Sequence, residues 1–409
     1  MLYHLFDFLK DYDFPGHNLM SFISFRAIMA NVTALLISLI WGRKFINWLI
    51  RHRIIDGGHK PGAEQVGERK FGFQDEQQKK NTPTMGGVFI IITIMISVLL
   101  FCDLTNIYTI LLIVTLLWMG GLGFIDDYIK VIKNDKRGLT EKQKLIGQFA
   151  LALGIALTVC FSPDIDTHKL ITTLPFIKAN EFDYSWLSPF SGQLGVYFTW
   201  GVYLLMIILV IIACSNSANL TDGMDGLAAG TSSIVGVVLM AFAWLGGNVI
   251  FAKYLSISYL PGTGEIVVFL SALVGALVGF LWYNAKPAEV FMGDVGSLAI
   301  GGVFGVAAVL IHKELLLPLL CGVFFMESLS TIIQRVSCKI TRKLKGEPIR
   351  VWSCAPLHHH FQKVENYKPN GRVIYPKPDP PHDEAKISVR FWIVQLILAV
   401  LTLALLKIR

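Results

Sequence analysis

The stretch IYTILLIVTLLWMGGLGFIDDYIK, residues 107–130, decides the fold. Its first part is apolar and long enough to cross the roughly 30 Å hydrocarbon core of a bilayer. The apolar part ends at Asp126 and Asp127, two adjacent carboxylates, and Lys130 follows three residues later. Ionisable groups at the edge of a membrane span are costly and usually functional. This stretch therefore predicts a transmembrane helix that ends in a polar site.

The composition extends this prediction to the whole chain. Of the 409 residues, 54% are hydrophobic and only 16% are charged, whereas a soluble domain has about 25% charged residues. The mean hydropathy is +0.57. Apolar segments are centred near residues 30, 93, 116, 153, 204, 236, 274, 304, 324 and 398. We therefore expect an all-α polytopic membrane protein with about ten transmembrane helices, forming a single integral membrane domain over 1–409.

The first apolar segment, the cysteines and one internal turn each bear on this prediction. The first apolar segment has few basic residues before it and no small-residue cleavage site after it, so we expect a retained helix and not a signal peptide. The six cysteines lack the spacing of a metal site or a disulfide framework. The weakest boundary is the turn at 312–314, which separates the eighth and ninth apolar segments.

The basic residues predict the topology. Of the 36 lysines and arginines, 28 lie in five alternate loops: 42–84, 126–144, 214–225, 284–296 and 335–390. The positive-inside rule places these loops in the cytoplasm and both termini in the periplasm. The unusual polar motifs all lie in these loops, so we expect the active site on the cytoplasmic face. The proline-rich segment at about 363–385 is expected to be a flexible cytoplasmic linker.

Acidic residues in these loops indicate a cation site. Clustered carboxylates repel one another unless a cation lies among them, and Mg²⁺ prefers carboxylate, water and phosphate oxygens. The acids are Asp126, Asp127, Asp222, Asp225 and Asp294, and the nearby lysines suited to phosphate are Lys79, Lys80, Lys130, Lys142 and Lys144. Acids, a metal ion and lysines on one face indicate phosphoryl transfer.

Each acidic motif also has a purely structural interpretation. Asp126 and Asp127 could be a solvated helix end, although acids there oppose the helix dipole. The residues of NLTDGMDGL, 219–227, are ordinary turn formers. Asp294 in FMGDVGS, 291–297, could simply cap a helix, although Gly293 beside it permits close approach of a ligand. TPTMGG, 82–87, could be a capped helix start.

Two basic motifs also leave alternatives open. The triplet His358, His359 and His360 could be a chance polar loop, a transition-metal site, or a contact to phosphate or ribose hydroxyls. After the ninth span, basic and apolar residues alternate at helical spacing over 335–345. This pattern is typical of an amphipathic helix on anionic headgroups, and its charge could also steer an anionic substrate.

The motifs TPTMGG, DDYIK, NLTDGMDGL, FMGDVGS and PLHHHF occur in this order among ten apolar segments. Together they resemble the phospho-N-acetylmuramoyl-pentapeptide transferase family over nearly the whole chain. Each motif alone is shared with the wider superfamily of polyprenyl-phosphate hexosamine-1-phosphate transferases, and TPTMGG and the histidines narrow the match. The departures are Met224 for a usual leucine, Gln362 where an acid commonly stands, and longer loops at 57–78 and 363–385.

The resemblance implies a reaction. UDP-N-acetylmuramoyl-pentapeptide would donate its phospho-MurNAc-pentapeptide to undecaprenyl phosphate, giving lipid I and UMP, with Mg²⁺ required. It also implies a homodimer in the bacterial cytoplasmic (inner) membrane, a cytoplasmic cleft and a lipid-open groove. Nucleic acid is not an expected partner.

The resemblance also implies residue roles. Asp294 is the expected Mg²⁺ ligand, with Asp126 and Asp127 as further candidates that position the metal or the lipid phosphate. Lys130 and Lys144 would hold phosphates, and the three histidines would contact the donor or shape the site. The positions that match the lining of the nucleotide cleft are Lys79, Thr84, Asn216, Asn219, Asp222, Asp225, Phe291 and Gly293. Phe291 could stack on uracil.

Two rival functions and one mechanistic choice stay open. A sibling enzyme would move N-acetylglucosamine-1-phosphate to the same lipid, and the histidine triplet argues against it. A cation-coupled transporter would place its polar groups near the midplane, whereas here they lie at one face. The phosphate of the acceptor has a second pKa of about 6, so we favour direct displacement with little need for a base over a covalent aspartyl intermediate.

Overall fold

The computed structural model describes residues 1–9, 17–55, 82–133, 135, 137–163, 165, 170–175, 181–362 and 371–407. Every one of the ten predicted segment centres lies in a helix. These helices are α2 (Ile23–Arg51), α4 (Gly87–Phe101), α5 (Ile107–Val131), α6 (Glu141–Phe161), α7 (Gly192–Thr221), α8 (Leu227–Gly246), α10 (Gly264–Asn284), α11 (Gly293–Leu310), α13 (Gly322–Lys345) and α15 (Glu384–Leu405).

Eight of these helices are long and apolar enough to cross a membrane. The other two are α4, which has 15 residues, and α13, which forms a bent pair with the preceding segment Glu314–Leu320. The chain bends by 79° between the two helical parts of this pair. At 1.5 Å per residue α4 is about 22 Å long, short of a full hydrocarbon core. The fold is therefore a mostly helical, polytopic membrane protein.

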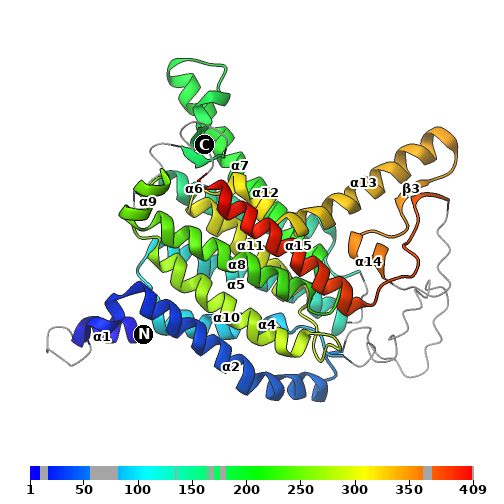
Figure 1. Cartoon of the computed structure of the whole chain (residues 1–409), viewed down its shortest axis with the longest axis horizontal. Helices are drawn as coiled ribbons and strands as arrows, with labels where there is room; N and C mark the ends of the chain where they lie inside the picture. The colour runs from blue at the N-terminus through cyan, green and yellow to red at the C-terminus, as the bar shows by residue number, and fades with distance from the viewer. Residues whose placement is uncertain are drawn as a thin grey trace.

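The helices α10 and α11 form the centre of the bundle. The apolar window of α10 is 83% buried and that of α11 is 89% buried, compared with 28% for α2 and α7. α10 packs against α2 and α8, and α11 packs against α5 and α7 (Figure 1). Among the eight candidate spans of the described chain these two have the most deeply buried apolar windows, as expected for helices that are apolar on nearly all sides.

Glycines allow the backbones near the start of α11 to approach closely. A Cβ on Gly87 of α4 would lie 2.1 Å from the amide nitrogen of Gly296. A Cβ on Gly123 of α5 would lie 2.2 Å from the carbonyl oxygen of Asp294. Small residues at helix crossings are the usual device for tight packing in membranes. Here they bring α4 and α5 against the first turn of α11.

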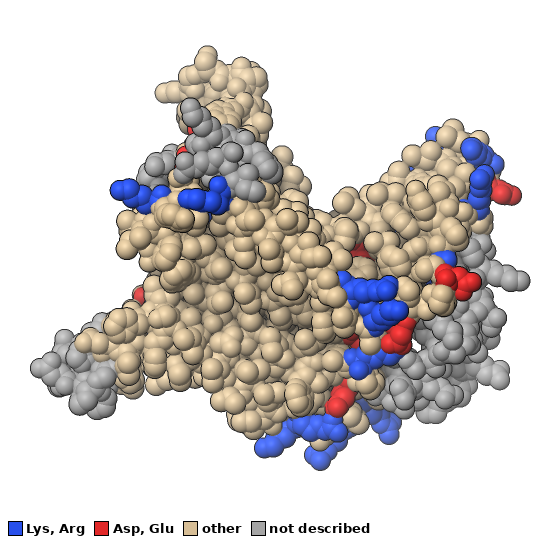
Figure 2. Space-filling model, viewed as in Figure 1, with Lys and Arg blue, Asp and Glu red and all other residues tan. Residues whose placement is uncertain are grey.

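The two ends of the bundle differ. Both chain termini lie at one end, and α14 (Leu357–Phe361) and β3 (Ile349–Trp352) lie at the other (Figure 1). Figure 2 shows lysines, arginines and acids gathered where α2 ends and α15 begins, with a wide band of uncharged surface beside them. A smaller group of cations lies near the opposite end of this band.

Several helices continue beyond the apolar segments and shorten the predicted loops. The loop expected at 42–84 begins only after Arg51, and α5 and α7 extend to Val131 and Thr221. Asp126, Asp127, Asn216 and Asn219 are therefore helical residues, not loop residues. The predicted loops thus include helix ends, because a helix continues as long as its backbone hydrogen bonds do, whereas hydropathy reports only the surrounding solvent.

The predicted loop at 335–390 also contains regular structure. α13 continues to Lys345, and β3 pairs in parallel with β4 (Arg372–Tyr375). Gln334 of α13 accepts hydrogen bonds from the amides of Val351 and Trp352 at 3.0 and 3.1 Å. In the described part of the proline-rich segment, residues 371–383, β4 is thus a paired strand. Residues 363–370 lie outside the described residues.

The end that carries the termini has its own polar cluster. There β1 (Ile171–Thr173) pairs with β2 (Glu181–Asp183), and η3 (Tyr184–Leu187) follows. The buried Lys313 donates to the hydroxyl of Thr173 at 2.8 Å, and Tyr184 donates to Glu314 at 2.9 Å. These bonds hold the β1–β2 pair and η3 against Lys313 and η4 (Glu314–Leu316), which α12 (Leu317–Leu320) follows.

A charged residue within the first apolar segment, Arg26, also has a partner. Arg26 of α2 lies 2.6 Å from one oxygen of Glu265, at the start of α10, and donates to its other oxygen at 2.9 Å. Both side chains are buried. The short elements that complete the described fold are α1 (Leu2–Leu9), η2 (His17–Ser21) and α9 (Val249–Leu255).

Candidate active site

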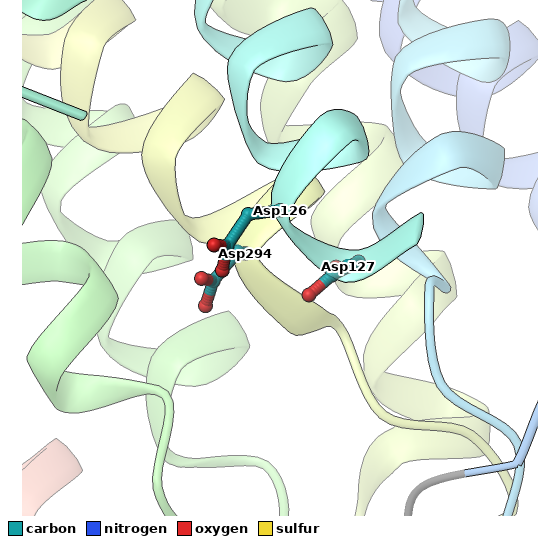
Figure 3. Close-up of side chains that lie close together, drawn as sticks. All are labelled: Asp126, Asp127 and Asp294. Atoms are coloured by element: carbon teal, nitrogen blue, oxygen red, sulfur yellow. The ribbon is translucent and has the colours of Figure 1, made fainter. Parts of the chain in front are cut away.

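Three aspartates meet near the ends of two helices. Asp126 and Asp127 lie in the last two turns of α5, and Asp294 lies in the first turn of α11. One carboxylate oxygen from each lies within 4.8 Å of the others (Figure 3). Asp126 and Asp127 are buried. The structure thus brings together carboxylates that are 168 positions apart in the sequence.

The turn before α11 explains how Asp294 and Asp127 come together. Gly293 has a φ of +74°, a conformation that disfavours side chains, and a Cβ there would lie 2.6 Å from Asp127 Oδ2. The backbone amide of Val295, in the first turn of α11, donates to the same oxygen at 3.2 Å. An amide at a helix N-terminus favours a negative charge. The first turn of α11 therefore stabilises both Asp294 and Asp127.

Two lysines neutralise part of this charge. Lys130 Nζ lies 2.5 Å from Asp126 Oδ2 and 2.9 Å from Asp294 Oδ2. Lys144 Nζ lies 2.8 and 2.7 Å from the same two oxygens. The other oxygen of Asp126 accepts from the amide of Leu139 at 2.6 Å. By formal charge, three carboxylates and two ammonium groups carry one net negative charge.

This donor set suits a hard divalent cation. Within the part of the chain that the structure describes, these aspartates are the one group of three or more acids, histidines or cysteines close enough to share an ion. All three offer carboxylate oxygens, which Mg²⁺ prefers, and neither thiolate nor imidazole is present in the group. The residues therefore fit Mg²⁺ by their chemistry.

Two asparagines of α7 have different partners. Asn219 donates to Asp294 Oδ1 at 2.7 Å and also lies 2.9 Å from the hydroxyl of Ser297. Asn216, one turn earlier, exchanges two hydrogen bonds with the buried Gln148 of α6, at 2.8 and 3.2 Å. Asn219 thus contacts an aspartate of the cluster, whereas Asn216 joins two helices.

The motifs TPTMGG and FMGD are bound to each other through their backbones. The amide of Phe291 donates to the carbonyl of Pro83 at 2.8 Å, and the amide of Gly86 donates back to the carbonyl of Phe291 at 2.8 Å. A Cβ on Gly293 would also lie 3.2 Å from the hydroxyl of Thr84. Thr84, Phe291 and Gly293 therefore belong to one assembly beside Asp127. Lys79 lies outside the described residues.

The two aspartates of NLTDGMDGL are not part of the carboxylate group. Asp222 caps the C-terminus of α7. Asp225 is buried, accepts from the amide of Ala288 at 3.2 Å, and its carbonyl accepts from Ser388 at 2.9 Å. Asp225 thereby joins this turn to the loop between α10 and α11.

The histidine triplet forms most of α14. The amide of the buried His358 donates to both oxygens of Glu327, at 3.2 and 3.3 Å, and its Nδ1 lies 3.2 Å from Glu327 Oε2. A Cβ on Gly223 would lie 2.3 Å from His358 Nε2. α14 therefore packs directly against the turn that contains Asp222. Burial and the nearby Lys377 lower the pKa of His360.

The sequence alone did not assign the partners that hold these residues. Gln148, Ser297 and Glu327 each contact a predicted site residue. A signal existed only for Glu327, since a carboxylate within an otherwise apolar segment indicates function or a buried partner. Gln148 and Ser297 are common polar residues near helix ends, with nothing local to set them apart.

Comparisons with known proteins identify the family of this chain. Residues 108–312 match the glycosyl transferase family 4, and residues 79–91 match signature 1 of phospho-N-acetylmuramoyl-pentapeptide transferases. Three similar proteins are named phospho-N-acetylmuramoyl-pentapeptide-transferase. They come from Bacteroides thetaiotaomicron, Bacteroides fragilis and Flavobacterium psychrophilum, and are 45%, 46% and 43% identical to this chain. Each alignment covers all of both chains. The chain therefore belongs to the phospho-N-acetylmuramoyl-pentapeptide transferase family.

Proposed function

We propose that this chain makes lipid I at the aspartate cluster, by transferring phospho-MurNAc-pentapeptide from its UDP-linked donor to undecaprenyl phosphate. The observation that carries the proposal is the convergence of Asp126, Asp127 and Asp294 with Lys130 and Lys144. A cation held by acids, with lysines beside it, matches two substrates that each bring phosphate.

The orientation follows from charge. We place the aspartate cluster on the cytoplasmic side of the bacterial inner membrane, with ten crossings and both termini in the periplasm. The basic loops support this orientation, and both termini lie at one end (Figure 1). On a cysteine-free background, an impermeant maleimide added to cells with a permeabilised outer membrane should label Lys407→Cys and not Lys345→Cys. The reverse pattern would contradict this topology.

Asp294 is the proposed principal Mg²⁺ ligand, and Asp126 and Asp127 complete or position the site. When bound, Mg²⁺ would neutralise negative charge on the diphosphate of the UDP-linked donor. Asn219 holds one oxygen of Asp294, which leaves the orientation of this carboxylate fixed before substrate arrives. The preorganised carboxylates avoid a reorganisation cost during the reaction.

Lys130 and Lys144 are the proposed phosphate-binding residues. Each ammonium group carries three N–H donors, and both lie within 3 Å of two aspartates. A cation at the aspartates would weaken these ion pairs, because it competes for the same oxygens. The lysines would then be available to the donor diphosphate and the lipid phosphate.

Direct displacement remains the proposed route. Asp126 already has three donors: Leu139, Lys130 and Lys144. A carboxylate whose lone pairs are used in this way is suited to positioning and poorly placed to remove a proton. The acceptor phosphate also needs little deprotonation near neutral pH.

The nucleotide and sugar are proposed to bind between the TPTMGG–FMGD assembly and α14. Thr84, Phe291 and Gly293 form one wall, and Asp222 with the histidine triplet forms the other. Asn216 and Asp225 are proposed to support this cleft through Gln148 and Ala288. The functional unit is proposed to be a homodimer, as in the family that the sequence resembles.

One assay tests the function. The protein would be purified in detergent with undecaprenyl phosphate and Mg²⁺, and UMP release would be measured with either UDP-MurNAc-pentapeptide or UDP-GlcNAc as donor. We expect UMP only with the muramoyl donor. Release with UDP-GlcNAc alone would identify the sibling GlcNAc-1-phosphate transferase and contradict the proposal.

A further inference from the structure

Glu327 is a buried carboxylate near the start of α13, just after the bend in the chain. Both of its oxygens accept from the backbone amide of His358, at 3.2 and 3.3 Å, and its Oε2 lies 3.2 Å from Nδ1 of the same residue. Neither side chain is exposed to solvent. Among the described residues, the donors that reach this carboxylate all belong to His358. A buried carboxylate needs such donors, so the positions of the two residues depend on each other.

The contact also determines where the ring of His358 carries a hydrogen. Both oxygens of Glu327 accept from an amide, as the oxygens of an ionised carboxylate do, and such a group has no hydrogen to donate. The ring nitrogen that faces it therefore has to carry one. A neutral ring would be the Nδ1–H tautomer, and a charged ring has a hydrogen on Nδ1 as well. The hydrogen on Nδ1 thus follows from Glu327 in either charge state of the ring.

The far edge of the ring rests on the turn that follows α7. A Cβ on Gly223 would lie 2.3 Å from Nε2 and 2.8 Å from Cε1 of His358, closer than two such atoms can approach. The ring therefore lies between the carboxylate of Glu327 and the backbone of Gly223. A side chain without exposed surface is suited to shaping the site and not to binding a ligand.

A third contact joins α13 to α7 beside Glu327. The hydroxyl of Ser328 donates to the hydroxyl of Ser217 at 2.8 Å, and Ser217 lies in the last turns of α7. α7 is thus bound to α13 through the serines, and α13 is bound to α14 through Glu327. α14 returns to the end of α7 through the ring of His358 and Gly223. A shift of α14 would have to break one of these contacts.

We propose that Glu327 is a positioning residue of the donor site, which holds His358 and through it keeps α14 against the turn at Gly223. Glu327 has this role on the basis of the proposed function, because α14 is taken to form a wall of the cleft for the nucleotide-sugar donor. The carboxylate touches none of the three aspartates. Its loss should therefore weaken binding of the donor and leave binding of the lipid acceptor unchanged.

The hydrogen on Nδ1 can be measured without any substrate. Protein labelled with ¹⁵N-histidine would be placed in nanodiscs at pH 8, and His358→Asn would assign the ring signals of His358. We expect a hydrogen on Nδ1 in the unsubstituted protein and a mixture of tautomers in Glu327→Gln, whose amide can donate or accept. Ser330→Ala removes a 2.7 Å bond to the backbone carbonyl of Glu327 and, as the control, should leave the signals unchanged. An Nδ1 without a hydrogen in the unsubstituted protein would overturn the proposal.

The kinetics of UMP release test the positioning role. Glu327→Gln should raise the KM of the donor about 10- to 150-fold, the range for a lost bond to a charged group. The KM of undecaprenyl phosphate should stay within about twofold, as should both constants in Ser330→Ala. In a His358→Leu background, Glu327→Gln should add less than about twofold, because the residue through which it acts is gone. Fully additive effects of the two substitutions would show that Glu327 does not act through His358.

A second substitution reaches His358 from the other side and leaves Glu327 in place. Gly223→Ala puts a methyl group where Nε2 and Cε1 lie, so the ring has to move and the KM of the donor should rise. His358→Asn lacks these two ring atoms but keeps an N–H donor for Glu327, so Gly223→Ala should add little in that background. An equal rise in both backgrounds would contradict the proposal. This pair of variants decides the question even if Glu327→Gln does not fold.

The two kinds of measurement separate this role of Glu327 from the proposed function. Absence of UMP release from folded, unsubstituted protein would reject the transferase proposal, while the nitrogen signals would still decide whether Glu327 orients His358. Normal UMP release with additive effects of Glu327→Gln and His358→Leu would reject only the positioning role. Monodisperse elution of each variant confirms that folded proteins are compared.

Discussion

Asn219→Ala is the substitution whose effect can be worked out most fully from the structure. The side-chain amide of Asn219 is the one neutral group seen to donate to Asp294 among the described residues, at 2.7 Å, and it also reaches Ser297. Alanine removes the donor, keeps the helix and adds no charge. Asp294 would then be held only by Lys130 and Lys144, both of which are proposed to move toward phosphate during the reaction.

The expected loss follows from the kind of bond that is removed. A hydrogen bond to a charged group contributes about 1.5–3 kcal/mol, and about 1.4 kcal/mol corresponds to a factor of ten. We therefore expect kcat to fall about 10- to 150-fold. The Mg²⁺ concentration for half-maximal rate should rise as well, because the carboxylate is no longer oriented before the ion binds.

The control is a matched asparagine in the same bundle. Asn31 of α2 donates to the carbonyl of Ser271 at 2.9 Å, away from the aspartates. Asn31→Ala should cost stability but leave the rate per folded molecule within about twofold, on the scale of ordinary surface effects. Initial rates of UMP release against Mg²⁺ concentration would be compared for both variants. If Asn219→Ala retains full rate, or if Asn31→Ala loses as much, the proposed role of Asn219 is wrong.

Two further substitutions probe other parts of the structure. Lys144→Met removes contacts to Asp126 and Asp294, and we expect kcat/KM to fall at least tenfold; an unchanged value in steady-state assays would exclude phosphate binding by this residue. Arg26→Met leaves Glu265 buried without its partner, which should destabilise the protein by about 3–5 kcal/mol and lower its thermal midpoint, with turnover of folded protein preserved. Adding Glu265→Gln should recover part of this loss; no recovery would show that the pair is not the cause.

The helices were predictable because the signal is physical and local. Apolar length alone placed a helix over every one of the ten predicted centres. The boundaries were less predictable, since Asp126 and Asn219 continue helices beyond the apolar segments. The assembly of Asp126, Asp127 and Asp294 was expected only because the alternate loops were assigned to one compartment, and the structure brings these residues together.

The partners behind the site residues could not be predicted. Gln148 meets Asn216 across 68 positions, and Glu384 meets Gln362 across 22 positions. No periodic pattern in the sequence reveals either contact, because such contacts depend on how whole helices pack. Nor did the turn at 312–314 suggest that Lys313 is buried against Thr173. Predicting these pairs requires the three-dimensional arrangement.

The most direct test of the central claim is the binding of a divalent ion to the aspartates themselves. Mn²⁺, a spectroscopic substitute for Mg²⁺, would be titrated into purified protein with undecaprenyl phosphate and UMP, and free Mn²⁺ would be followed by electron paramagnetic resonance. We predict one bound ion per chain, competed by Mg²⁺, with affinity at least tenfold weaker in Asp294→Asn while Asn31→Ala binds normally. Equal affinity in folded Asp294→Asn and the unsubstituted protein would contradict the account.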